Sequence, residues 1–150
     1  MLFRSKAQIL VSCGAKHSLY NLAEALLEAG DEIIIPAPYW VSYADQALLN
    51  DATPVFLPTD EATGYAIDPA SLERLVTPRT KAILVNSPCN PTGAVYERKT
   101  LEAIADIAVR RQLLIISDEI YEKVLYDGAV HRSIATLSPD RKSTRLNSSH

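Results

Sequence analysis

The chain has 150 residues, of which 47% are hydrophobic and 22% are charged, so it is able to bury a core and has the size of one domain. The formal net charge of −3 argues against nucleic acid as a partner, because binding a phosphate backbone needs a basic surface. No apolar stretch approaches the roughly 20 residues that span a bilayer, so no membrane association is expected.

The first part of the chain predicts strands that alternate with helices. Residues 8–12 (QILVS) form a continuous apolar run that predicts a strand. A helix with leucine and alanine at helical spacing follows Gly14 and stops at Gly30. The next predicted elements are a strand at 32–35, a short helix at 41–49 and a strand at 54–57.

The second part repeats the alternation. Asp68 is expected to cap a helix that opens at Pro69. A strand at 81–85, an amphipathic helix at 99–111 and a strand at 113–117 follow. Because the strand runs are apolar throughout rather than at every second residue, both faces of the strands are expected to be buried. The sequence therefore predicts an α/β fold, with a mostly parallel sheet and helices on both faces.

Ligands of such folds bind beyond the carboxyl ends of the strands, so the polar residues that follow each strand are the candidates for a site. They are Gly14 to Lys16, Pro38 to Trp40, Asn86 to Gly93, and Asp118 to Tyr121.

These strand ends carry a family resemblance. The stretches SCGAKHSL, APYWVSY, VNSPCNPTG and SDEIYEKVLYDG occur in this order and spacing. They resemble the large domain of class I, fold-type I pyridoxal-phosphate-dependent aminotransferases, in particular the bacterial aspartate aminotransferase subgroup, over residues 6–139. The resemblance implies a partial three-layer α/β/α large domain, without the small domain, and pyridoxal 5′-phosphate as the cofactor.

The resemblance assigns the cofactor's phosphate and ring face to two stretches. Gly14, Ala15 and Lys16 open a helix, where free amides and the positive end of the helix dipole suit a phosphate. An ordinary tight turn would use the same residues. Trp40, the single tryptophan, is the aromatic that the family stacks on the pyridine ring and places beside the substrate. The alternative role of Trp40 is a half-buried core aromatic.

Three further residues are assigned to the cofactor's polar atoms. By resemblance, Asn90 bonds the phenolic oxygen and the substrate's α-carboxylate, Asp118 faces the ring nitrogen, and Tyr121 donates to the phenolic oxygen. A carboxylate at the ring nitrogen keeps that nitrogen protonated and the ring electron-accepting. The alternatives are turn chemistry for Asn90, a cap for Asp118 and an exposed side chain for Tyr121.

The remaining polar residues of these stretches receive structural roles. Asn86 and Glu119 are expected to be scaffold, a turn is expected at Asp127 and Gly128, and His131 is expected at the surface. No His, Cys or carboxylate group has the spacing of a metal site, so no metal is expected. Two cysteines without an export signal predict reduced thiols and a cytoplasmic protein, with no disulfide.

The family's Schiff-base lysine would follow Asp118 by roughly thirty residues, beyond the last residue of this sequence. No catalytic residue is therefore assigned, and the 150-residue chain is expected to be inactive by itself. Residues 1–5 and 141–150 resemble translated sequencing adapters, and we expect them to be non-native; a genuine polar tail is the alternative.

The resemblance implies that the parent protein is a homodimer that moves an amino group between an aspartate-like amino acid and a 2-oxo acid in amino-acid biosynthesis. Two alternatives stay open. One is an aminotransferase specific for prephenate, aromatic or diaminopimelate-type substrates. The other is a ligand-sensing aminotransferase-like domain of a transcription regulator.

Overall fold

The computed structural model describes residues 6–137 and 144–146. In this part of the chain, five strands form one parallel sheet in the order β2-β1-β3-β4-β5. The strands are β1 (Glu32–Ala37), β2 (Thr53–Pro58), β3 (Thr80–Asn86), β4 (Leu114–Asp118) and β5 (Thr144–Leu146). The helices are α1 (Ala15–Leu26), α2 (Ser42–Leu48), α3 (Pro69–Leu75) and α4 (Arg98–Arg111), with short 3-10 helices at Lys6–Gln8, Glu61–Thr63 and Ile134–Thr136.

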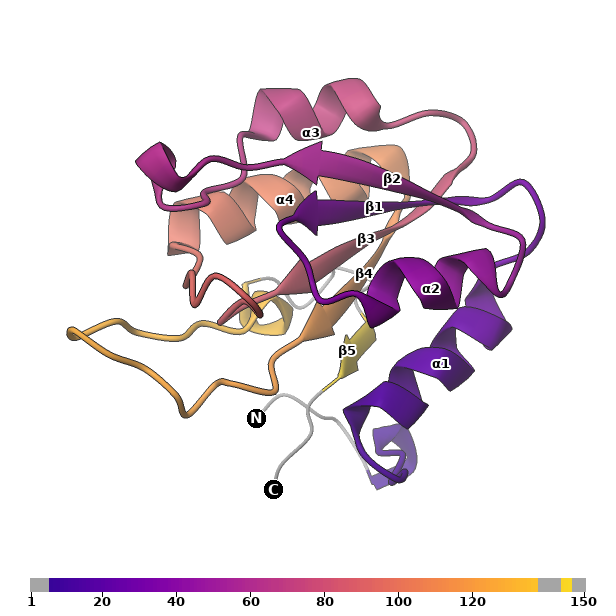
Figure 1. Ribbon diagram of the computed structural model, residues 1–150, viewed down its shortest axis with the longest axis horizontal. Coiled ribbons are helices and arrows are strands. Elements are labelled where there is room, and N and C mark those ends of the chain that lie inside the picture. Colours follow the sequence, from indigo (N-terminus) through magenta and orange to yellow (C-terminus); the bar gives the residue numbers. More distant parts are fainter. Residues whose placement is uncertain (1–5, 138–143, 147–150) are drawn as a thin grey trace.

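Helices cover both faces of the sheet, which confirms the predicted α/β class (Figure 1). Side chains of one strand alternate between the two faces. In β1, Ile33 and Ile35 pack in the cluster that includes α1 and α2 residues, whereas Ile34 packs in the cluster that includes α3 and α4 residues. Both clusters are apolar because a parallel strand between two helical layers has no solvent-facing side.

Helix α3 begins as the sequence predicts. The Asp68 carboxylate accepts hydrogen bonds from the amides of Ala70 and Ser71 at 3.3 and 3.0 Å. Pro69 occupies the first turn, where its missing N–H costs no hydrogen bond. The local signals in the sequence therefore determine where this helix starts.

The strand predicted at residues 8–12 is wrong. Lys6–Gln8 form a 3-10 helix, and no strand is formed at 9–12. The side chains of Ile9, Leu10 and Val11 are 55%, 76% and 91% exposed. An apolar run becomes a strand only where a neighbouring strand supplies its hydrogen bonds, and none does so within the described residues.

The sequence beyond residue 140 contributes one described segment. Thr144–Leu146 form β5, which pairs in parallel with Ile116–Asp118 of β4 at the edge of the sheet. The other residues expected to be non-native, 1–5, 141–143 and 147–150, lie outside the described residues. The proposal that these ends are non-native stays a prediction.

The strand order reverses between β1 and β3, because the connection from β1 runs outward to β2 and the next strand returns to the other side of β1. The pairing of β1 with β3 ends at Ile34 and Ile83, although the strands continue to Ala37 and Asn86. The strands therefore separate toward their carboxyl ends. A sheet of this kind binds ligands at such a reversal.

Candidate functional site

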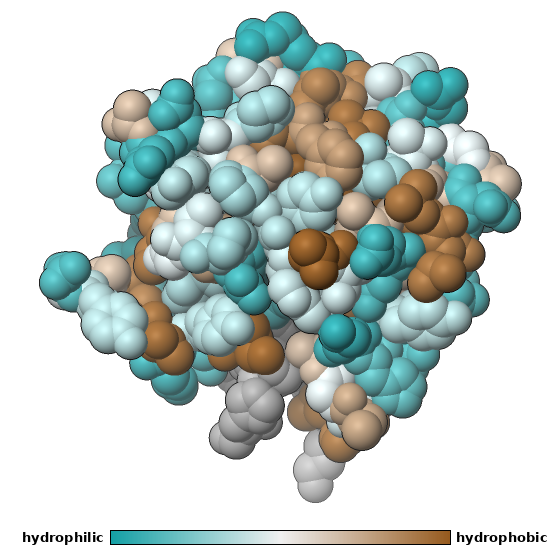
Figure 2. Space-filling view, viewed as in Figure 1, coloured by the Kyte–Doolittle hydropathy of each residue, from teal (hydrophilic) through white to brown (hydrophobic). Residues whose placement is uncertain are grey.

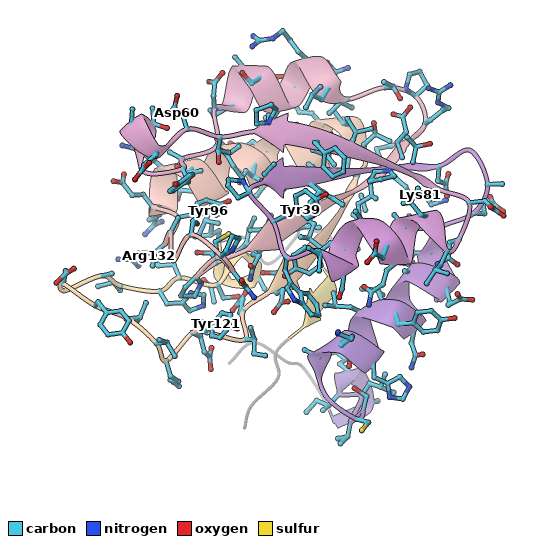
Figure 3. The ribbon with its side chains drawn as sticks, viewed as in Figure 1. Tyr39, Asp60, Lys81, Tyr96, Tyr121 and Arg132 are labelled. Carbon is cyan, nitrogen blue, oxygen red and sulfur yellow. The ribbon has the colours of Figure 1, made fainter. Side chains whose placement is uncertain are left out.

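A small hollow lies where β1 and β3 separate. It is lined by Pro36, Pro38, Tyr39, Tyr43, Leu84, Asn86, Cys89 and Tyr96. Figure 3 shows Tyr39 and Tyr96 near the ends of the β1 and β3 arrows, with Tyr121 near the end of β4. Figure 2 shows this face of the molecule as largely polar, with apolar side chains in separate patches.

Asp118 is a buried carboxylate at the end of β4, with 4% of its surface exposed. Its Oδ2 accepts a hydrogen bond from the Tyr43 hydroxyl at 2.8 Å, and its Oδ1 accepts one from the Ile120 amide at 3.1 Å. Burial raises the pKa of Asp118 above its ordinary value, and these two hydrogen bonds oppose that rise. The protein thus supports a carboxylate at a position where burial alone would disfavour its charge.

Tyr43 is a site residue that the sequence analysis missed. It lies on the buried side of α2, 4% exposed, and reaches across to β4. The pKa of Tyr43 is raised far above its usual range. Burial is the largest cause, the nearby charge of Asp118 is the second, and Cys89 and Tyr121 contribute less. Tyr43 therefore stays a hydrogen-bond donor. A tyrosine on the apolar stripe of a helix is a signal for such a buried hydroxyl, because the hydroxyl needs a partner.

Asn86 joins two strand ends, in agreement with its expected structural role. Its side-chain amide donates to the carbonyls of Asp118 at 3.0 Å and Pro88 at 3.2 Å, and its Oδ1 accepts from the Asn90 amide at 2.8 Å. The peptide bonds before Pro38, Pro88 and Pro91 are cis. Asn86 thereby fixes the backbone of Asn90 relative to β4.

The start of α1 meets the strand ends through Lys16 and Trp40. The ammonium group of Lys16 lies 4.8 Å from the centroid of the Trp40 ring, and the Trp40 and Tyr43 rings meet edge to face at 5.3 Å. Gly14 caps α1 at a φ of 83°, a conformation that favours glycine, and no side chain caps the helix. The first amides of α1 are thus left to other acceptors.

Contacts link most of the predicted site residues into one group. Lys16 contacts Trp40, Trp40 contacts Tyr43, and Tyr43 bonds Asp118. Asn90 joins this group through Asn86, as described above. Tyr121 is 37% exposed and lies three residues beyond Asp118.

The predicted surface position of His131 is wrong. Its side chain is only 11% exposed, and Nε2 lies 3.0 Å from Oε2 of the buried Glu119. The reason is the turn at Asp127 and Gly128, which forms as predicted, with φ values of 52° and 74°. This turn reverses the chain and returns His131 to the end of β4.

The same reversal groups three side chains that are able to bind metal ions. Ligand atoms of Glu119, Glu122 and His131 all lie within 4.8 Å of one another. The sequence spacing of these residues gives no such indication. The prediction that the protein binds no metal stays a prediction. Both cysteines, Cys13 and Cys89, are free thiols, as predicted.

Among the described residues, no helix has the length and apolar character needed to cross a membrane.

The reversed strand order, the separating strand ends and the buried carboxylate define an α/β fold with a topological switch point, the place where ligands bind in folds of this class. The chain belongs to the aminotransferase class I and II family, whose model matches residues 1–148.

About half of the aligned residues are identical between this chain and its relatives. The chain is 49% identical over 137 residues to an aspartate aminotransferase of Geobacillus stearothermophilus, and this alignment covers 91% of this chain and 35% of that protein. A bifunctional aspartate aminotransferase and glutamate/aspartate-prephenate aminotransferase of Petunia hybrida is 52% identical over 131 residues, 87% of this chain and 27% of that protein. The chain thus spans about a third of the relatives' length.

The solved structures agree with the fold. The aspartate aminotransferase of Thermus thermophilus with maleate superposes with a TM-score of 0.85 at 44% identity, over 89% of this chain and 35% of that one. The aromatic aminotransferase of Pyrococcus horikoshii gives a TM-score of 0.85 at 43% identity, over 89% of this chain and 36% of that one. The resemblance and the fold class inferred from the sequence are therefore confirmed.

Proposed function

We propose that the strand-end site of this chain holds pyridoxal 5′-phosphate and that residues 6–139 are the cofactor-binding part of an aminotransferase. The observation that carries the proposal is the buried Asp118 carboxylate at the switch point, bonded by Tyr43 and Ile120. Family membership supports the choice of cofactor. When bound, this cofactor supplies an electron-accepting ring for reactions at the α-carbon of an amino acid.

Asp118 is the proposed partner of the ring nitrogen. A carboxylate oxygen accepts more than one hydrogen bond, so Asp118 has acceptor capacity beyond Tyr43 and Ile120. The donation from the Tyr43 hydroxyl favours the charged form of Asp118 and orients its oxygens. A charged Asp118 would hold a proton on the ring nitrogen.

The start of α1 is the proposed phosphate site. Apart from Gly14 and its two chain neighbours, no residue has an atom within 4 Å of where a Cβ at Gly14 would be, and Gly14 leaves the first amides of α1 without a side-chain cap. Those amides and the helix dipole attract a dianion. Lys16 adds a positive charge beside Trp40, the ring proposed to stack on the cofactor.

Asn90 and Tyr121 are the proposed partners of the phenolic oxygen. The Asn86 Oδ1 accepts the backbone N–H of Asn90 at 2.8 Å, which fixes the position from which the side-chain amide of Asn90 would donate. Trp40 and Asn90 are also the proposed substrate contacts. These two residues would bind and orient the substrate rather than move protons.

For the whole protein, we propose transfer of an amino group between an aspartate-like amino acid and a 2-oxo acid, by a cytoplasmic homodimer in amino-acid biosynthesis. The names of the aspartate aminotransferases that this chain resembles support the donor. Prephenate is a second candidate acceptor, because the Petunia hybrida relative carries that activity in its name.

Calorimetric titration of the chain with pyridoxamine 5′-phosphate tests the cofactor proposal. This form has no aldehyde, so it does not react with surface lysines. We expect saturable binding, and binding at least about tenfold weaker for pyridoxamine without the phosphate, because the helix amides lose their charged partner. Equal affinities for the two ligands, or no binding of either, would contradict the proposal.

A further inference from the structure

We propose that Glu119 and His131 are positioning residues that clamp the loop 120–132 at its base and thereby hold the Ile120 amide on Asp118. The link to a cofactor rests on the proposed function above. The clamp itself rests on the geometry of the chain.

Glu119 is the centre of the clamp and is 1% exposed. Its Oε1 accepts hydrogen bonds from the Ser117 hydroxyl at 2.8 Å and the Ser133 hydroxyl at 2.7 Å. Its Oε2 lies 3.0 Å from Nε2 of His131. A buried carboxylate is costly unless hydrogen-bond donors surround it, so all three contacts are needed to keep Glu119 buried.

The donors come from both sides of one loop. Ser117 precedes the loop, His131 lies at its returning end and Ser133 follows it. The loop reverses at Asp127 and Gly128, where the Ala129 amide donates to the Tyr126 carbonyl at 2.9 Å. Glu119 therefore joins the outgoing and the returning chain.

The rest of the loop has little packing of its own. Val124, Tyr126 and Val130 are 48%, 75% and 63% exposed. Figure 1 shows the segment after β4 extending away from the sheet before it returns. A segment with few buried contacts is held mainly at its base, which is where Glu119 lies.

The clamp acts on Asp118 through the backbone. Ile120, the first residue of the loop, donates its amide to Asp118 Oδ1 at 3.1 Å, so movement of the loop would weaken this bond. The same chain segment that holds Glu119 to Ser117, Ser133 and His131 therefore positions the donor to Asp118.

Two substitutions at His131 distinguish the effect of its hydrogen bond to Glu119 from the effect of its side-chain volume. His131→Leu keeps an apolar side chain of similar size but donates nothing to Glu119. His131→Gln restores an N–H donor. Arg132→Gln is the matched control, because Arg132 is exposed and lies in the same loop (Figure 3).

Two measurements on the chain without cofactor test the clamp. In His131→Leu we expect the amides of the loop to exchange with deuterium about tenfold faster, while those of β1 and α4 stay unchanged. The NMR signal of the Ile120 amide proton should move upfield, because its hydrogen bond to Asp118 weakens. His131→Gln should recover both values, and Arg132→Gln should change neither.

Unchanged exchange and an unchanged Ile120 amide signal in His131→Leu would overturn the clamp. A loss of loop protection caused by a chelator alone would also overturn it, because a bound cation would then hold Glu119 and Glu122. If His131→Leu does not fold, Ser133→Ala removes one donor and should shift both measurements in the same direction. Failure to bind pyridoxamine 5′-phosphate with both shifts present would refute the cofactor site and leave the clamp standing.

Discussion

Asp118 experiences two opposing influences at the end of β4. Burial disfavours its charge, whereas the Tyr43 hydroxyl and the Ile120 amide favour it, and burial dominates because the pKa is raised. A carboxyl group with a raised pKa in the folded state binds protons more readily there than in the unfolded chain. Its contribution to stability therefore declines as the pH rises above its ordinary pKa.

Replacing Asp118 with asparagine should reveal this decline. The free energy of unfolding of Asp118→Asn, relative to that of the unsubstituted chain, should increase between pH 4 and pH 7, because the variant has no charge to bury. Urea unfolding at both pH values measures the change. Asp51→Asn, at an exposed turn position, is the control and should show little change. A pH-independent difference for Asp118→Asn would contradict the assignment.

Tyr43→Phe tests the support of Asp118. The substitution removes the donor to Oδ2 and leaves a buried carboxylate oxygen without that partner. We expect a loss of about 1–3 kcal/mol in the free energy of unfolding at neutral pH. Tyr126→Phe, at a 75% exposed position, should cost less than about 0.5 kcal/mol in the same denaturation experiment. Equal losses for the two variants would argue against a special role for Tyr43.

At the scale of elements, Glu32 connects the start of β1 to the turn before β3. Its carboxylate accepts hydrogen bonds from the Thr77 hydroxyl at 2.6 Å and from Arg79 Nη2 at 2.7 Å, and it is 4% exposed. The pKa of Glu32 is lowered despite its burial, mainly by the hydrogen bond from Thr77 and next by the hydrogen bond from Arg79. The stabilisation is therefore present above the ordinary pKa of glutamate and is lost as the pH falls through the folded-state value.

Glu32→Gln should destabilise the chain by about 1–2 kcal/mol at pH 7, because the amide group puts donors where Glu32 accepts hydrogen bonds. The difference from the unsubstituted chain should shrink as the pH falls below the ordinary pKa of glutamate. Glu102→Gln, which breaks an exposed pair with Arg98, should cost less than about 0.5 kcal/mol. Denaturation at several pH values checks both variants, and a Glu32→Gln effect that persists unchanged in acid would contradict this account.

Elements with local signals were predictable from the sequence. Asp68 and Pro69 mark the start of α3 before any tertiary contact is known. The conformation of residues 8–12 could not be predicted correctly. These apolar residues have strand propensity, but they have no partner strand in the described part of the chain. Strand formation depends on a neighbour that the run itself does not specify.

Residues of the candidate site could be proposed from the sequence where they follow strands. Asn90, Asp118 and Trp40 lie directly beyond predicted strands, and parallel strands bring such positions to one edge. Tyr43 and His131 were missed for a different reason. Tyr43 reaches Asp118 across 75 residues of sequence, and His131 is buried only because a turn returns it to Glu119.

At the scale of the whole molecule, the proposed ligand site depends on the separation of β1 and β3 beyond Ile34 and Ile83. The start of α1 and the ends of three strands meet there, so the proposed phosphate, ring and ring-nitrogen partners come from segments far apart in the sequence. A change in one of them should therefore affect binding without unfolding the sheet. Asp118→Asn is the variant that isolates the ring-nitrogen contact.

The fluorescence of Trp40 during titration with pyridoxamine 5′-phosphate tests the central claim most directly, because Trp40 is the single tryptophan and is the ring proposed to stack on the cofactor. We predict saturable quenching in the unsubstituted chain and at least about tenfold weaker binding in Asp118→Asn, since a charge-assisted hydrogen bond is lost. Quenching that does not saturate, or equal affinities in the two chains, would contradict a cofactor site built on Trp40 and Asp118.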